Sequence, residues 1–283
     1  MAASVAGAHR LVRRWLFFGR LDALWMIRDL GSFAGYAFSE GLKVLAAIAT
    51  MLLLSERFDG VGPWTQPQVV FLLGFAVTAN GMIDDLFGYN VAYISRRIGR
   101  GQLDHVLMQP QPMPLTLLTE GFSPAAGLPV LGTGLLLLAW GIGGTAAPAS
   151  PLWFALLALN LGASCVVILA FAYAVGSLAF WAPRAAEEIN SSSWSLITQL
   201  RAFPLDGVRP ALLGGLLSVV PAGFAAWYPC RALLGLDHWR PSVVVTPLAA
   251  VAFALVALWI FRTGMAHYLD TGSQRYLSYG HRR

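Results

Sequence analysis

The sequence predicts an all-α polytopic membrane protein with six transmembrane helices. Of its 283 residues, 57% are hydrophobic and only 12% are charged, whereas soluble domains carry about 25% charged residues. Six apolar stretches reach the length of about 20 residues that a helix needs to cross a bilayer. We therefore expect a six-helix domain over 33–262, with a basic segment at 1–32 before it and a tail at 263–283 after it. This composition excludes an ordinary soluble enzyme, a disordered chain and a nucleic-acid-binding protein.

The N-terminal segment, 1–32, interleaves large apolar side chains with arginines. It lacks the apolar core and the small-residue cleavage site of a signal peptide. We favour an interfacial helix on the inner leaflet, with its arginines at the anionic headgroups. Because Asp22 interrupts the apolar stripe, an irregular basic tail is the alternative.

The six predicted spans follow in order along the chain. They cover about 33–54, 67–88, 116–144, 153–181, 209–230 and 243–262. The third and fourth are long enough to tilt in the bilayer. The fifth contains Pro221 and Pro229, so this region, up to residue 242, is expected to be either kinked or partly re-entrant.

The orientation follows from the arginines. If both termini are cytoplasmic, 15 arginines fall in inner segments, among them the loop 183–207, and only Arg57, Arg231 and Arg240 lie outside. Positive charge concentrates in cytoplasmic loops of membrane proteins. We therefore predict a multi-pass protein of the plasma (inner) membrane with both termini in the cytoplasm.

The loop at 95–115 is the most informative segment between spans. Gly101 breaks the preceding helix and Pro110 ends the next one, which leaves two helical turns at 102–109. Asp104 lies in the first turn, where the helix dipole favours an anion. The apolar residues of this short helix share one face by their i, i+3 and i+4 spacing, and they are Leu103, Val106 and Leu107. This face either packs under its own bundle or enters a groove on a second protein.

Two groups of charged residues lie in or near the predicted spans. Glu40 and Lys43 share a helix face in the first span, and they form either a pathway or subunit contact or a local ion pair. Asp84 and Asp85 lie near the inner end of the second span. Adjacent residues cannot share one helix face, so only one of these carboxylates can point into the bundle. They form either a proton relay or a hydrated helix end.

The run IGRGQLDHVLMQPQP at 98–112 resembles a signature of type-2 ABC exporter permeases, Ile-Arg-x-Gly-x-Leu-Asp-x-x-Leu-x-x-Pro. The matching residues are Ile98, Gly101, Leu103, Asp104, Leu107 and Pro110. The basic residue of the signature is displaced, because Gly99 takes its place and Arg100 follows. Two weaker similarities, at 219–235 and at 261–268, appear in the same order as in that family. Together the resemblance runs from about residue 28 to residue 275.

The resemblance implies the type-2 ABC exporter permease fold and the role of a permease half. Such a subunit pairs with a second permease, identical or a sister subunit, and with two copies of a cytoplasmic ABC ATPase. The helix at 102–109 would then be the coupling helix that docks on the ATPase. The residues implied in coupling are Arg97, Gly101, Leu103, Asp104, Val106, Leu107 and Pro110. Membrane lipids would surround the subunit.

The chain itself carries no phosphate-binding loop. Its single lysine, Lys43, follows leucine inside a span, whereas a Walker loop requires Gly-x-x-x-x-Gly-Lys-Ser/Thr. We therefore expect a transport subunit with no catalytic residues and no cofactor or metal of its own, and with ATP and Mg bound by the partner ATPase. We also expect Leu103→Asp or Leu107→Asp to uncouple transport without unfolding the protein.

Two other classes of function are weighed against this one. An ion- or proton-coupled secondary transporter would use Glu40, Asp84 or Asp85, but such transporters usually show internal repeats, and the halves of this chain show no convincing one. An intramembrane enzyme would need converging His, Asp or Cys residues within the spans. Only Cys165 and the carboxylates named above qualify.

Overall fold

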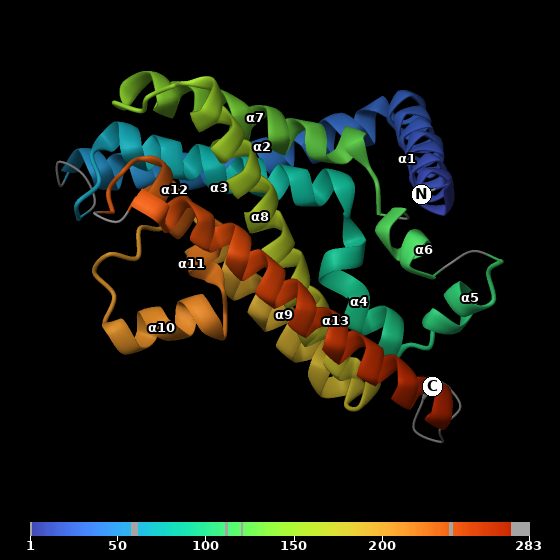
Figure 1. Cartoon of the computed structure of the whole chain (residues 1–283). Coiled ribbons are helices and arrows are strands. Elements are labelled where there is room, and N and C mark those ends of the chain that lie inside the picture. The colour runs from blue at the N-terminus through green and yellow to red at the C-terminus, as the bar shows by residue number, and fades with distance from the viewer. Residues whose placement is uncertain (1, 58–61, 111–112, 120, 238–239, 273–283) are drawn as a thin grey trace.

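The computed structural model describes residues 2–57, 62–110, 113–119, 121–237 and 240–272. Within these ranges the regular secondary structure is entirely helical (Figure 1). The helices are α1 (Ala2–Arg28), α2 (Leu30–Arg57), α3 (Gln66–Leu86), α4 (Tyr89–Gly99), α5 (Leu103–Leu107), α6 (Met113–Thr119), α7 (Pro124–Gly144), α8 (Pro151–Gly176), η1 (Ser177–Phe180), α9 (Pro183–Leu200), α10 (Pro210–Ser218), α11 (Ala222–Ala225), α12 (Trp227–Leu233), η2 (Arg240–Val244) and α13 (Val245–Thr271). Most of the predicted tail, 273–283, and residues 111–112 of the predicted coupling loop lie outside the described residues.

Four of the described helical segments are long and apolar enough to cross a membrane. They are Gln66–Leu86, Gly127–Gly144, Pro151–Phe180 and Pro241–Thr271. They coincide with the second, third, fourth and sixth predicted spans, which confirms an all-helical, multi-pass membrane protein. Helix α2 covers the first predicted span, and α1 turns sharply away from it (Figure 1).

Helices α3 and α7 pack antiparallel through glycines spaced seven residues apart. On α3 these are Gly74 and Gly81, and on α7 they are Gly127, Gly134 and Gly141. A Cβ atom added to Gly134 would lie 2.5 Å from the backbone nitrogen of Thr78. Small residues of this kind let two membrane helices approach closely, so the α3–α7 pair forms a tightly packed wall of the bundle.

The bundle has two ends, which we name the Trp64 end and the α5 end. Helices α8 and α13 both run from the Trp64 end toward the α5 end. Near their starts, the Asn160 side chain donates a hydrogen bond of 3.1 Å to the carbonyl of Val243. Near their ends, Gly264 packs against the ring of Phe180. The chain must therefore return to the Trp64 end between these two helices.

Helix α9 begins this return, which corrects the sequence-based placement of the fifth span. Near its start, Glu187 forms an ion pair of 2.7 Å with Arg96 of α4 at the α5 end. Just beyond its end, Asp206 accepts a hydrogen bond of 2.5 Å from the indole of Trp64 at the opposite end. The segment 183–206 therefore connects the two ends, and the prediction that 183–207 is an inner loop is wrong. Hydropathy misses α9 because one buried stripe of the helix packs on α4 and α8 while its other side is polar.

The predicted fifth span, 209–230, is not one crossing helix. It is divided among α10, which lies at the side of the bundle, and α11 and α12, which pack into it. Together they form a hairpin that returns to the Trp64 end (Figure 1). At its turn, the hydroxyl of Ser164 in α8 donates a 2.8 Å hydrogen bond to the carbonyl of Phe224. At its end, the indole of Trp153 donates a hydrogen bond of 2.9 Å to the carbonyl of Leu233. Because a helix rises 1.5 Å per residue, the hairpin reaches about 16 Å along α8.

Candidate functional site

A short helix, α5, is present where the sequence predicts a coupling helix at 102–109, and it is shorter than expected. Gly101 adopts a positive φ of 66°, which glycine reaches without steric cost. The next residue, Gln102, donates its backbone N–H to the carbonyl of Arg97 at 2.9 Å. This turn reverses the chain after α4 and sets the direction in which α5 leaves it. Pro110 follows α5 and is exposed.

The apolar face predicted for this helix is divided in the structure. Leu103 is fully buried and Val106 is 5% exposed. Both pack into a cluster of residues from α4, α6, η1 and α13. Leu107, by contrast, is 40% exposed and the following Met108 is 73% exposed. Part of the face therefore packs under its own bundle, and the expectation that Leu103→Asp leaves the fold intact is wrong because it would bury a charge.

Polar contacts hold α5 and the end of the helix that precedes it. The hydroxyl of Tyr268, near the end of α13, donates a hydrogen bond of 2.5 Å to Asp104. Glu187 of α9 accepts from Arg96 of α4 and pairs more weakly, at 3.5 Å, with Arg100. These contacts connect α5 to α13, and α4 to α9, at one end of the bundle.

The outward surface of this region is a small exposed patch, which we name the coupling patch. Its members are Gln102, His105, Leu107 and Met108. It combines two exposed apolar side chains with two polar ones. Exposed apolar side chains rimmed by polar residues are typical of protein-protein interaction sites.

Helix α9 exposes a second, polar surface. The side chains of Glu188, Ser192, Ser195 and Gln199 follow one another at helical spacing, and all four are exposed. Within this polar stripe, the amide of Gln199 donates a 2.9 Å hydrogen bond to the hydroxyl of Ser195. Exposed Ile189 and Leu196 flank it. On the opposite side of the helix, Asn190 and Ile197 are buried.

The carboxylates predicted in the second span diverge. The side-chain amide nitrogen of Asn80 donates a hydrogen bond of 2.8 Å to Asp84. Its amide oxygen accepts one of 2.5 Å from Arg201, which lies just beyond α9. Asp85 is only 7% exposed, and its Oδ1 atom lies against the backbone of Gly127. Asp84 thus belongs to a network that joins α3 to α9, while Asp85 points into the contact with α7.

Glu40 and Lys43 form the local pair that was one of the two expectations. The Nζ and Oε1 atoms are 2.6 Å apart, and the lysine side chain is 67% exposed. Glu40 also lies close enough to Asp84 to interact with it electrostatically, so this pair lies beside the Asn80 network of α3.

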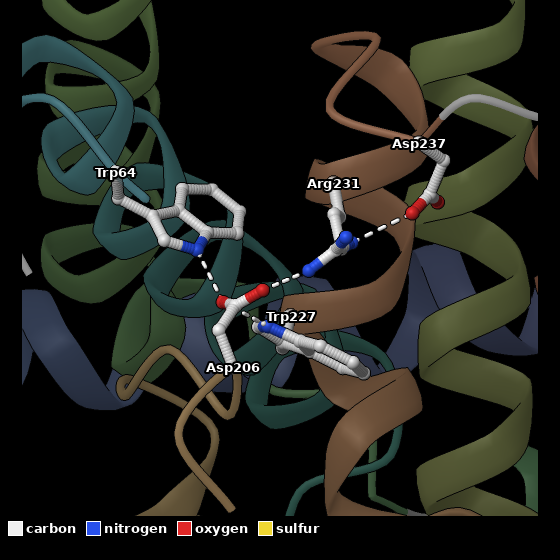
Figure 2. Close-up of polar contacts among 5 residues, drawn as sticks. All are labelled: Trp64, Asp206, Trp227, Arg231 and Asp237. Atoms are coloured by element: carbon white, nitrogen blue, oxygen red, sulfur yellow. Dashed lines mark hydrogen bonds and ion pairs between the residues drawn. The ribbon is translucent and has the colours of Figure 1, made fainter. Parts of the chain in front are cut away.

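Asp206 is the centre of a polar cluster at the Trp64 end that sequence analysis missed (Figure 2). Its carboxylate accepts hydrogen bonds from the indoles of Trp64, at 2.5 Å, and Trp227, at 2.8 Å. It also forms an ion pair with Arg231, which in turn binds Asp237 at 2.6 Å. We name these five residues the Asp206 cluster. It joins the start of α3 to both ends of the α10–α12 hairpin, a connection that no local motif could reveal.

The fold defines a polytopic helical membrane protein. Residues 41–272 match the family described as ABC-2 family transporter protein. The chain belongs to this family of ABC transporter permeases and is a membrane transport component. No curated protein and no solved structure matches the chain significantly.

Proposed function

We propose that the chain is the permease half of an ATP-driven exporter, coupled through α5 to a separate ABC ATPase. The observation that carries the proposal is the coupling patch, which leaves Leu107 and Met108 exposed at one end of a chain that belongs to an ABC permease family. Since α5 contacts α4 and α13, ATP-driven movement at the patch would reach helices that cross the membrane.

The polar stripe of α9 supports the view that the pathway needs a second permease. Polar side chains in membrane helices almost always face the interior of a bundle or a water-filled cavity. In the single chain this stripe is exposed, so another subunit, identical or a sister permease, would cover it or complete an aqueous pathway along it. Arg201 and Asn80, which lie at the far end of α9, would border the same pathway.

The arginines support the orientation of the permease in the plasma membrane. Arg96, Arg97 and Arg100 precede α5, and Arg262 lies near the end of α13. Because cytoplasmic segments carry the excess of positive charge, the α5 end would face the cytoplasm, where the ATPase with its ATP and Mg resides. The Trp64 end would then be the exit side.

The proposal is tested with Leu107→Asp in the purified transporter complex. The substitution places a charge in the coupling patch without burying it, so we expect normal insertion, weakened binding of the ATPase and loss of the permease-stimulated ATP hydrolysis. Leu269→Asp is the matched control, because Leu269 is also exposed, on α13, and lies outside the patch. Normal ATPase binding and stimulation in Leu107→Asp would contradict the proposal.

A further inference from the structure

An apolar groove lies between α6, α8 and α13. It encloses about 330 Å³, and its lining includes Leu117, Leu169, Tyr173, Ala254 and Phe261. Apart from the tyrosine hydroxyl, the side chains that line it are hydrocarbon or thioether. Cavities of this size are typical of sites that bind small ligands.

The groove opens on the part of the bundle that faces hydrocarbon. Helices α8 and α13 are both membrane-crossing segments, and most of α13 is exposed in the single chain. On α13, the groove-lining Leu258 and the neighbouring Val251 and Leu255 are apolar and exposed. A helix that presents such a surface within a bilayer is surrounded by acyl chains, so an acyl chain is the molecule that has direct access to this groove.

Positive charge lies at the α5 end of the groove. Arg262 directly follows the lining residue Phe261 and is exposed. The guanidinium of Arg97 lies close enough to the hydroxyl of Tyr173 to interact with it electrostatically. On the α6 side, Arg14 donates a 3.3 Å hydrogen bond to Thr116. Two carboxylates also lie at this end, but Asp104 accepts a hydrogen bond from Tyr268 and Glu187 pairs with Arg96 and Arg100. On α13 itself, the acidic Asp270 lies two turns beyond Arg262.

We propose that the groove holds one acyl chain of an anionic phospholipid, whose phosphate binds at Arg262 and Arg97. The apolar lining selects the chain, and the arginines select an anionic headgroup over a zwitterionic one. The bound lipid would fill the space between α6 and α13 and so join the coupling region to a crossing helix. This proposal depends on membrane insertion and not on coupling to an ATPase.

The test uses the full chain in nanodiscs made of either phosphatidylglycerol or phosphatidylcholine with identical acyl chains, followed by native mass spectrometry. We expect one tightly retained phosphatidylglycerol per chain. Ala254→Phe fills the groove and should remove the retained lipid, whereas Ala252→Phe, on the exposed side of the same helix, should keep it. Arg262→Gln should weaken retention of phosphatidylglycerol about fivefold, because one arginine near an anionic lipid contributes about 1 kcal/mol.

Three results would overturn the proposal. Equal retention of the two lipids by the unmodified chain would remove the role of the arginines. Undiminished retention in a folded Ala254→Phe variant would place the lipid elsewhere. The third result is a disulfide between two copies that carry Leu258→Cys at the rim of the groove. If it forms without added lipid, a second copy of the chain covers the groove. Because Arg262 is exposed, we expect Arg262→Gln to fold normally. Its lipid retention therefore tests the proposal even if Ala254→Phe fails to fold.

Discussion

Replacing Asp206 with alanine tests whether the Asp206 cluster holds the α10–α12 hairpin in place. The carboxylate of Asp206 accepts hydrogen bonds from two indoles and forms an ion pair with Arg231. The Asp206 side chain is only 9% exposed. The substitution removes all three interactions at once. It leaves the indole N–H groups of Trp64 and Trp227 without their acceptor and leaves Arg231 with Asp237 alone.

The expected loss of stability follows from these contacts. Removing one partner of a buried ion pair costs about 3–5 kcal/mol. Because Arg231 is 27% exposed and keeps its second carboxylate, we expect the lower value, about 3 kcal/mol. This corresponds to about two orders of magnitude in the unfolding equilibrium constant. Asp206→Asn keeps one oxygen as an acceptor for the indoles but loses the charge, so its effect should lie between those of the alanine variant and the unmodified chain.

The assay is reversible unfolding in mixed detergent micelles, with tryptophan fluorescence as the signal because two of the cluster's residues are tryptophans. Amide hydrogen exchange then localises the change, which should concentrate in residues 210–233. Asp270→Ala, an exposed acidic residue at the other end of the bundle, is the control and should change stability by less than about 0.5 kcal/mol. A loss below about 1 kcal/mol in Asp206→Ala, or exchange that rises equally in all helices, would refute this account.

Two further predictions concern the helix contacts. Gly134→Ala should destabilise the α3–α7 pair by about 1–3 kcal/mol through overpacking, since its Cβ would lie 2.5 Å from a backbone nitrogen. Gly132→Ala has open space around it and should stabilise its helix by up to about 1 kcal/mol, so equal effects in micelle unfolding would contradict the packing argument. Tyr268→Phe removes the hydrogen bond to Asp104 and should speed amide exchange in 103–107 by about fivefold, for a bond worth about 1 kcal/mol. Unchanged exchange there would show that α13 does not hold α5.

The sequence was sufficient for the class of protein and for most of the membrane-crossing segments. The four helices that are long and apolar enough to cross a membrane, such as Pro151–Phe180, were predictable because a continuous apolar run is a local property of the chain. The position of α5 was also predictable, since Gly101 and Pro110 bound it locally and the surrounding motif resembles the permease signature. The family match over 41–272 confirms that resemblance.

The path of the chain through the bundle along α9 could not be predicted from a local property of the sequence. A polar stripe on α9 lowers its hydropathy, while the apolar hairpin at 210–233 imitates a span. Only the ion pair of Glu187 at one end and the hydrogen bonds of Asp206 at the other reveal the true path. These contacts join residues that are far apart in sequence, so no local pattern encodes them.

The sequence by itself therefore determined that this chain is an all-helical membrane protein with a short helix after Gly101 at one end. The tertiary structure decided which residues of a helix face are buried inside the protein and which remain exposed. It buries Leu103 and leaves Leu107 exposed, although both belong to the same predicted face. The physical reason is that helical periodicity specifies which residues share a face, whereas neighbouring elements decide how much of that face they cover.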